Sequence, residues 1–138
     1  MKTILILEEE AYLMRLLHHM LRGYIVLQAS NAQEALQSFE ENTGKVGLFI
    51  ADVTLPASSG VEVALALRRR DPALPIILTS GYPESAWNDR DILDLQRLGS
   101  DSVVIVQKPF NRQHLLECVH KLTGDGATVE RAGSSGPG

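Results

Sequence analysis

The chain has only one cysteine, Cys118, and no apolar run long enough to cross a membrane. One thiol cannot form an internal disulfide, and no histidine stands at a spacing typical of a zinc site. A membrane-spanning helix needs about 20 consecutive apolar residues. The first residues also lack the basic start and apolar length of a signal peptide. We therefore expect a cytoplasmic protein without a membrane segment, with Cys118 buried in a helix.

Positive charge is in the minority, because 13 Lys and Arg face 17 Asp and Glu, which gives a net charge of -4. Nucleic-acid-binding domains usually carry a basic face, so direct nucleic-acid binding is not expected. The densest basic cluster, Arg68-Arg69-Arg70, is expected at the solvated end of a helix. A composition that is 44% apolar and 22% charged is typical of a globular protein. The 138 residues suffice for one domain with its own core.

Five short apolar segments punctuate the chain, most of them without polar alternation. This pattern is typical of parallel strands that are buried on both faces. The segments are residues 3–7, 24–28, 46–51, 75–79 and 103–106. Between and after them, residues 11–22, 32–41, 61–70 and 111–123 show helical periodicity. For residues 84–98 two interpretations stay open: a helix opened by Pro83 with Ile92, Leu95 and Leu98 buried, or a loop across residues 87–89.

Strands and helices therefore alternate five times. This order predicts an α/β fold, with a doubly wound parallel sheet covered by five helices and joined by right-handed crossovers. Asn31 and Asn111 are predicted helix caps, and Asp71-Pro72 and Gly124 are predicted stops. Residues 1–123 form the expected domain. Residues 124–138 contain five glycines and are expected to be a flexible tail. No second domain is expected.

Polar residues follow the predicted strands at their carboxyl ends, where ligand sites gather in such sheets. They are Glu8, Glu9 and Glu10 after the first strand, Asp52 after the third, Thr79 and Ser80 after the fourth, and Lys108 after the fifth. Crowded carboxylates repel one another, and Mg²⁺ suits a site of oxygen ligands with room for phosphate. Together with Lys108 it would neutralise a phosphoryl group. Asp52 is the candidate nucleophile, and the Thr79 hydroxyl is a candidate donor to a phosphoryl oxygen.

Four stretches, residues 3–17, 49–60, 75–84 and 103–116, resemble the receiver domain of bacterial response regulators. ADVTLPASSG carries a proline four residues and a glycine eight residues after Asp52, and QKPF resembles the family's Lys-Pro-Phe. The resemblance extends over residues 3–123. It implies a flavodoxin-like sheet with strand order 2-1-3-4-5. It also implies phosphorylation from a histidine kinase, a phosphotransfer protein or a small phosphodonor, in a signalling domain that is not itself an enzyme.

The resemblance also implies residue roles. Asp52 would be the phosphorylation site, Glu8 and Glu9 would help it hold Mg²⁺, and Thr54 would ligate the metal through its carbonyl. Thr79 would be the switch hydroxyl, and Lys108 would contact the phosphoryl group. The SGYPE stretch is similar to receivers at the C-terminal side of hybrid sensor histidine kinases, although stand-alone regulators also show it. A homodimer through the last helices is a further implied possibility.

Three positions depart from the family's pattern. Glu9 stands where the acidic pair usually has aspartate, and its extra methylene displaces a carboxylate from the tight octahedral geometry of Mg²⁺, so weaker binding is expected. Ile105 stands where the family commonly has Tyr or Phe, so a conformational switch here needs another readout, such as the loop at residues 80–90. Gly81 leaves the site more open to water than a side chain would.

Three other interpretations compete with this one. A pseudo-receiver would keep the fold and bind partners without phosphorylation, and the Glu9 substitution favours it. A haloacid-dehalogenase-type phosphohydrolase would need a second aspartate two residues after Asp52, where Thr54 stands. A flavin-binding protein would need a phosphate cradle in the first strand-to-helix loop, where three glutamates stand. The intact set of Asp52, Thr79 and Lys108 favours the phosphorylated receiver.

Overall fold

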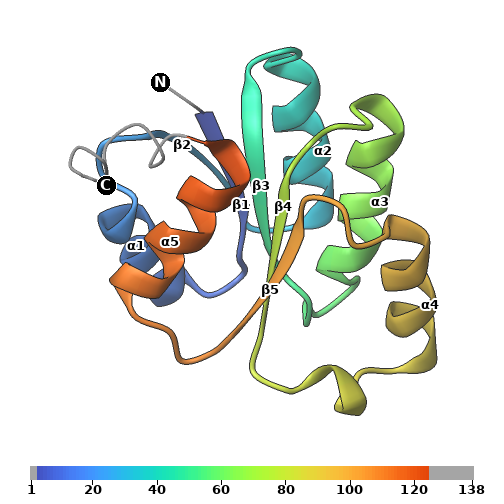
Figure 1. Cartoon of the computed structure of the whole chain (residues 1–138). Coiled ribbons are helices and arrows are strands. Elements are labelled where there is room, and N and C mark those ends of the chain that lie inside the picture. Colours follow the sequence, from blue (N-terminus) through green and yellow to red (C-terminus); the bar gives the residue numbers. More distant parts are fainter. Residues whose placement is uncertain (1–2, 125–138) are drawn as a thin grey trace.

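A computed structural model describes residues 3–124, which form a five-stranded sheet with helices on both faces (Figure 1). All neighbouring strands are parallel, and their order is β2-β1-β3-β4-β5. The strands are β1 (Thr3–Leu7), β2 (Ile25–Ala29), β3 (Val46–Asp52), β4 (Ile76–Ser80) and β5 (Val103–Gln107). The predicted fold class and strand order are confirmed, with strand ends shifted by one residue at most.

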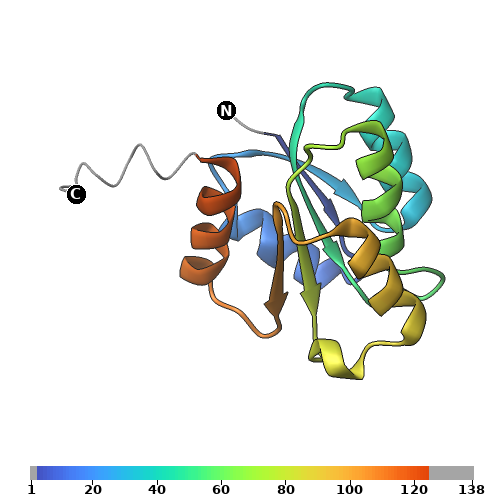
Figure 2. The same ribbon diagram turned by 45° about the vertical axis from the view of Figure 1, so that its right-hand side comes forward.

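The helices cover the two faces of the sheet unequally (Figures 1 and 2). They are α1 (Ala11–Met20), α2 (Ala32–Glu41), α3 (Gly60–Arg70), α4 (Asp89–Leu98) and α5 (Arg112–Thr123), with a short 3₁₀ turn, η1 (Glu84–Ala86). Helices α1 and α5 lie on one face, and α2, α3 and α4 lie on the other. None of the helices within residues 3–124 has the length and apolar character needed to span a membrane.

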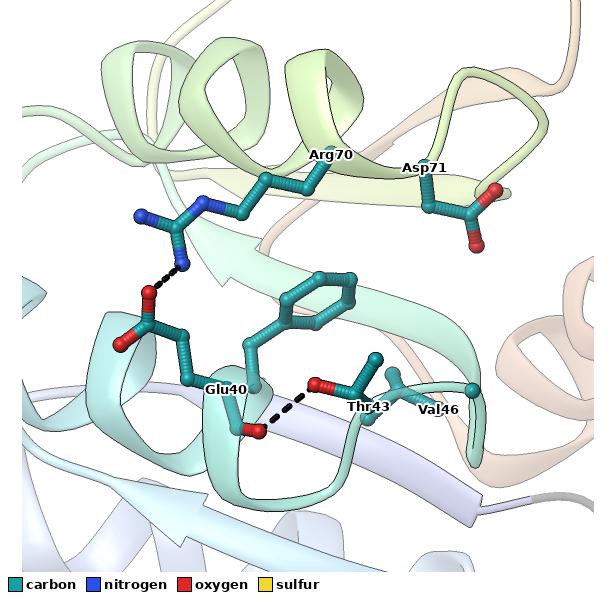
Figure 3. Close-up of a pocket in the computed structure, with 7 residues that line it drawn as sticks. Glu40, Thr43, Val46, Arg70 and Asp71 are labelled. Atoms are coloured by element: carbon teal, nitrogen blue, oxygen red, sulfur yellow. Dashed lines mark hydrogen bonds and ion pairs between the residues drawn. The ribbon is translucent and has the colours of Figure 1, made fainter.

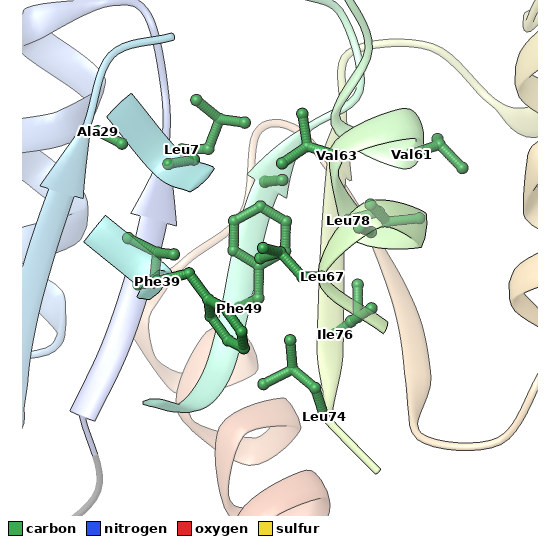
Figure 4. Packing of buried hydrophobic residues seen from close by; sticks show 14 of the residues in the cluster. Leu7, Ala29, Phe39, Phe49, Val61, Val63, Leu67, Leu74, Ile76 and Leu78 are labelled. Atoms are coloured by element: carbon green, nitrogen blue, oxygen red, sulfur yellow. The ribbon is translucent and has the colours of Figure 1, made fainter. Parts of the chain in front are cut away.

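The core consists of two layers, one on each face of the sheet, because successive side chains of a strand point to opposite faces. On β3, Phe49 and Ala51 pack in the layer under α2 and α3, whereas Leu48 and Ile50 pack in the layer under α1 and α5. Figure 4 shows the Phe49 ring among side chains from both neighbouring helices, including Phe39 of α2. The continuous apolar runs of the sequence thus follow from burial on both faces.

The predicted helix ends agree with the structure where a specific cap forms. The side chains of Asn31 and Asn111 accept hydrogen bonds from the amides of Glu34 and His114, both at 2.8 Å. Gly124 ends α5 in the left-handed conformation, with φ of 80°. These caps satisfy amides and carbonyls that the helix itself leaves without partners.

The segment 84–98 is not one helix opened by Pro83. After η1, Trp87 and Asn88 are extended, and the Asn88 side chain caps α4 by accepting from the Asp91 amide at 2.8 Å. The loop interpretation is therefore correct for residues 87 and 88. Of the three apolar residues predicted to be buried on this helix, Leu98 is buried, whereas Ile92 and Leu95 are only partly buried.

Two aspartates, Asp91 and Asp94, are buried on α4 as well. Asp94 pairs with Arg90 at 3.2 Å and with Arg97 at 3.4 Å, one turn away on each side. These flanking guanidinium groups supply the charge partners that a buried carboxylate requires. Hydrophobic periodicity contains no signal for such a pairing.

Arg68 does not lie free at the solvated end of its helix, as the basic cluster suggested. Its guanidinium donates to the carbonyls of Leu74 at 2.7 Å, Asp101 at 2.9 Å and Leu98 at 3.2 Å. Arg68 thereby ties the end of α3 to the end of α4 and to the loop before β5. Residues 125–138, which make up nearly all of the predicted tail, lie outside the described residues.

Gly60, the first residue of α3, lies directly against the backbone of Asp52. A Cβ atom on Gly60 would stand 2.2 Å from the Asp52 carbonyl oxygen and 2.9 Å from the Ala51 Cβ. The clashing atoms are mainly backbone, so relief requires α3 or the end of β3 to move. The absence of a side chain at residue 60 thus lets α3 pack close to the end of β3.

Gly60→Ala is therefore expected to lower the free energy of unfolding by about 1–3 kcal/mol, the usual cost of overpacking. Without a clash, a Gly-to-Ala exchange in a helix raises the free energy of unfolding by about 0.4–1 kcal/mol. The sign of the change therefore shows whether Gly60 lies as close to the Asp52 backbone as the structure indicates. Urea unfolding measures it, and Gly81→Ala is the matched control because a Cβ there meets no atom within 4 Å. A Gly60→Ala protein as stable as the wild type would contradict the close approach.

Candidate functional site

Three charged side chains meet at the carboxyl edge of the sheet. Glu8 follows β1, Asp52 ends β3, and Lys108 follows β5. The Lys108 Nζ donates to Asp52 Oδ2 at 3.0 Å and approaches Glu8 Oε1 at 3.5 Å. Residues separated by up to 100 positions in the chain thus share one ammonium group, because parallel strands bring their carboxyl ends to the same edge.

Both carboxylates are buried, with exposed fractions of 2% for Glu8 and 8% for Asp52. A charge removed from water needs a partner or further hydrogen bonds to remain ionised. Here two carboxylates share one ammonium, so the cluster carries an excess of negative charge when all three groups are ionised. This excess makes the site attractive to a cation.

Backbone amides fix the second oxygen of each carboxylate. Glu8 Oε2 accepts from the amide of Glu10 at 3.1 Å, and Asp52 Oδ1 accepts from the amide of Thr54 at 3.0 Å. Both amides lie two residues further along the chain, in the turns that follow the strands. Each carboxylate is therefore held between a backbone N–H and Lys108, which restricts its rotamers before any ligand binds.

Burial raises the pKa of Glu8 above its ordinary value. The Glu10 amide and the Lys108 ammonium act in the opposite direction, while the nearby negative charge of Asp52 adds to the increase. The effect of burial and of Asp52 exceeds the stabilisation that Lys108 provides. One ammonium therefore does not fully compensate the two carboxylates.

Two hydroxyl groups end β4 beside these charges. Thr79 is the register partner of Asp52 on the neighbouring strand and is only 1% exposed. Within residues 3–124 its hydroxyl has no hydrogen-bond partner, which is uncommon for a buried polar group. Ser80 is equally buried, but its hydroxyl is bonded to Tyr82 and Trp87. The sequence placed Ser80 at this edge without assigning it a role, and nothing in the sequence predicted the contact between Ser80 and Trp87.

Glu9 and Thr54 do not join the cluster through their side chains. Both are exposed, and Glu9 lines a separate cavity of about 390 Å³ beside the start of α2, together with Leu55 and Pro56. Among the residues that the structure describes, no three His, Cys, Asp or Glu side chains converge in a way that would hold a metal ion. The structure thus brings together Glu8, Asp52 and Lys108, with Thr79 alongside, and leaves Glu9 apart.

A larger cavity of about 480 Å³ lies at the opposite edge of the sheet (Figure 3). It is lined by Phe39 and Glu40 of α2, by Arg70 and Asp71 at the end of α3, and by Val46 at the start of β3. Arg70 and Glu40 form an ion pair across it. None of the residues that the sequence singled out at the strand ends lines this cavity.

Comparisons with known proteins agree on one family. The family model of the response regulator receiver domain matches residues 4–120. The chain is 31% identical over 102 residues to the sensor kinase CckA of Brucella abortus, and 36% identical over 112 residues to the alkaline phosphatase synthesis transcriptional regulatory protein PhoP of Bacillus subtilis. These matches cover 73% and 80% of this chain but only 10% and 43% of the relatives.

Solved structures show the same fold. A response regulator receiver domain protein from Clostridium thermocellum superimposes with a TM-score of 0.77 at 22% identity, covering 94% of this chain and all of the other. The receiver domain of the hybrid histidine kinase CckA superimposes with a TM-score of 0.70 at 28% identity, covering 88% of this chain and 98% of the other. The chain therefore matches whole receiver domains but a minor part of the two longer proteins.

The raised pKa of Glu8 predicts a pH-dependent stability difference. The folded protein holds this proton more tightly than the unfolded chain does, so the contribution of Glu8 to wild-type stability falls as the pH rises from the ordinary carboxyl pKa through the raised one. The glutamine that replaces Glu8 in a Glu8→Gln variant does not titrate but can still accept from the Glu10 amide. In metal-free buffer, this variant should therefore gain stability relative to the wild type between about pH 4 and about pH 7, as measured by urea unfolding.

Glu34→Gln is a control of opposite sign. The amide and hydroxyl of Ser30 donate to the Glu34 carboxylate and lower its pKa, so its contribution to stability is present at neutral pH and lost in acid. This variant should lose stability relative to the wild type as the pH rises from acid to just above the ordinary carboxyl pKa, and the difference should then stay constant up to neutral pH. If Glu8→Gln followed the trend of Glu34→Gln, the net effect assigned to burial of Glu8 would be wrong.

Proposed function

Because this chain belongs to the response regulator receiver domain family, we propose that its residues 1–123 act as a phosphoacceptor domain in which Asp52 takes a phosphoryl group. The donor is a histidine kinase or a phosphotransfer protein, and a small phosphodonor such as acetyl phosphate serves in vitro. The phosphorylated domain then binds its partner differently. Receiver domains act in two-component signalling, and we propose Asp52, Lys108 and Thr79 as the residues that carry out the phosphoryl transfer here.

The observation that supports the proposal best is the contact of Lys108 Nζ with Asp52 Oδ2 at 3.0 Å. A carboxylate oxygen of Asp52 attacks phosphorus, and the bond from phosphorus to the donor's nitrogen or oxygen breaks, so that the donor leaves with the electron pair. The product is an aspartyl phosphate, whose oxygens carry more negative charge than the carboxylate did. The Lys108 ammonium already lies where that charge develops.

Thr79 is proposed as a donor to one phosphoryl oxygen. Its hydroxyl lies on the strand next to Asp52, at the register position opposite it, and has no partner within residues 3–124. A buried hydroxyl without a partner gains a hydrogen bond when an acceptor is brought beside it. Formation of the aspartyl phosphate would supply that acceptor.

Mg²⁺, which the family implies, suits the donor atoms present. The excess negative charge of Glu8 and Asp52 is carried by hard oxygen atoms, which Mg²⁺ prefers. We propose Glu8, Asp52 and the Thr54 carbonyl as ligands, with Glu9 as the additional acid that the resemblance implies. When bound, the ion supplies positive charge beside the phosphoryl oxygens. Glu9 is the weakest member of this set, because its side chain is exposed and lines a different cavity.

A pseudo-receiver is the second candidate function, and the position of Glu9 favours it. If the acidic pair cannot hold a metal ion, the domain would bind partners through a fixed surface without phosphorylation. A phosphohydrolase of the haloacid-dehalogenase type has less support, because Thr54 donates its amide to Asp52 and offers no carboxyl group as acid or base. The three candidates differ in what happens to a phosphodonor.

The test is the intact mass of the purified chain after incubation with acetyl phosphate and Mg²⁺. The proposal predicts that the wild type gains the mass of one HPO₃ and that Asp52→Ala gains none, because the nucleophile is absent. Asp101→Asn is the matched control, since Asp101 is an exposed carboxylate on the loop before β5 and should leave the gain unchanged. Addition of EDTA should prevent it.

Each of the other outcomes would favour a different function or a different acceptor residue. No gain of mass in the wild type at any Mg²⁺ concentration would support the pseudo-receiver. Continuous release of inorganic phosphate over many turnovers would support the phosphohydrolase. Modification that persists in Asp52→Ala would show that another residue is the acceptor.

A further inference from the structure

Helix α4 carries two arginines that are held by one buried carboxylate. The Nε of Arg90 donates to Asp94 Oδ2 at 3.2 Å, and the Nη1 of Arg97 donates to Asp94 Oδ1 at 3.4 Å. The Asp94 side chain is only 2% exposed, whereas the side chains of Arg90 and Arg97 are 68% and 60% exposed. One buried acid thus holds two guanidinium groups at the surface of the domain.

Stability alone does not account for this triad. Removing a carboxylate from water costs free energy, and two exposed arginines, which water and salt screen, return only part of it. A buried ion pair or triad can often be replaced by apolar residues of similar volume without loss of stability. What the triad provides is position, because each guanidinium is bonded to a different oxygen of the same carboxylate. Arg90 and Arg97 therefore lose less side-chain freedom when they bind a further group.

Both guanidinium groups keep donors for a partner outside the domain. A guanidinium has several N–H groups arranged in a planar fork. Within residues 3–124, Arg90 and Arg97 each donate to Asp94 and to no other group. The remaining N–H groups are exposed with the side chains that carry them. Carboxylates are the acceptors whose geometry matches such a fork.

An exposed leucine shares this face of the helix with the two arginines. Arg90, Leu93 and Arg97 occupy positions i, i+3 and i+7, which lie on one side of a helix. We call these three residues the arginine face. Leu93 is 44% exposed, which is unusual for a large apolar side chain in this domain. Two guanidinium groups and one carboxylate leave one positive charge in excess here, although the whole chain has a net charge of -4.

The arginine face points away from the groove beside β5. That groove is a cavity of about 530 Å³, lined by Leu95 of α4 and Ile105 of β5 among others. Because successive helix residues are rotated by about 100°, Leu95 lies about 140° from Arg90 and about 160° from Arg97 around the helix axis. Helix α3 packs against α4 on the same face of the sheet (Figures 1 and 2). The arginine face is therefore a surface distinct from the groove between α4 and β5.

We propose that the arginine face binds an acidic amphipathic helix of another protein, in which two carboxylates flank one apolar side chain. In an antiparallel helix these residues would lie at positions i, i+4 and i+7, which sets the carboxylates opposite Arg90 and Arg97 and the apolar residue against Leu93. Charge complementarity supplies the specificity, and contact with Leu93 removes apolar surface from water. The exposed leucine and the negative net charge favour a protein partner over a nucleic acid. The contact needs no phosphoryl group on Asp52, so it goes beyond the proposed function.

The test is an NMR titration of the nitrogen-labelled full chain, without phosphodonor, with an alanine-based helical peptide that carries Glu, Leu and Glu at positions i, i+4 and i+7. The amide signals of α4 should shift, and salt should weaken the binding. Arg90→Met and Arg97→Met should each raise the dissociation constant by about two- to fivefold, the effect of losing one exposed ion pair. Arg15→Met is the matched control. Arg15 is exposed on α1, on the other face of the sheet, so its loss should leave the binding unchanged.

Asp94→Leu separates the positioning of the arginines from the stability of the domain. This variant should unfold at a urea concentration no lower than the wild type requires. It should nevertheless bind the peptide about two- to fivefold more weakly, because the guanidinium groups are no longer held in place. Loss of the carboxylate also raises the positive charge of the arginine face, so stronger binding would show that Asp94 only screens the arginines. Stronger binding, or a clear loss of stability, would overturn the positioning role of Asp94.

Other outcomes would overturn the arginine face or its occupant. Unshifted α4 signals in the wild type, or unchanged binding after both arginines are replaced by methionine, would overturn the surface itself. Equal binding of a peptide with glutamine in place of glutamate would overturn recognition by charge. Equal binding of a short DNA duplex would make the face a general anion site, and self-association that the double variant abolishes would make the occupant a second copy of this chain. None of these results changes whether Asp52 accepts a phosphoryl group, so the proposed function is tested separately by the gain of mass.

Discussion

The structure around the candidate site depends on one ammonium group shared by two buried carboxylates. Lys108 reaches both Asp52 and Glu8, so two carboxylates share one positive charge, and burial together with the charge of Asp52 raises the pKa of Glu8 despite that contact. A fully neutralised cluster would have little tendency to bind anything further. Because negative charge remains in excess beside a fixed ammonium, the site suits a divalent cation together with an anionic group, which is the combination that phosphoryl transfer requires.

The fold brings the ends of β1, β3 and β5 to one edge of the sheet, and the backbone around these strand ends is held in place. Gly60 allows α3 to approach the Asp52 carbonyl, and backbone amides two residues after each acid fix Glu8 and Asp52. The same edge carries Ser80, whose hydroxyl is already engaged with the loop that leads to α4. Contacts therefore run from Asp52 to Lys108, from Lys108 to Ser80, and from Ser80 to Trp87.

Apolar periodicity predicted most of the fold, since burial on both faces of a parallel sheet leaves continuous runs such as residues 46–51, and Asn31 and Asn111 cap helices by local chemistry. The convergence of Asp52 and Lys108 was predictable because parallel strands place their carboxyl ends at the same edge of a sheet. The exposure of Glu9, the buried Asp94 between two arginines, and the contact of Trp87 with Ser80 were not predictable. Each depends on side-chain direction or on a tertiary partner, which residue spacing does not encode.

The sharing of Lys108 between the two carboxylates can be tested most directly by following the Glu8 side-chain carboxyl by carbon-13 NMR titration, in metal-free wild type and in Lys108→Met. Removal of the ammonium eliminates the only side-chain cation in the contacts of Glu8 within residues 3–124. The pKa of Glu8 should therefore rise further in the variant. An unchanged Glu8 pKa would show that Lys108 does not compensate this carboxylate, and the account of the site would be wrong.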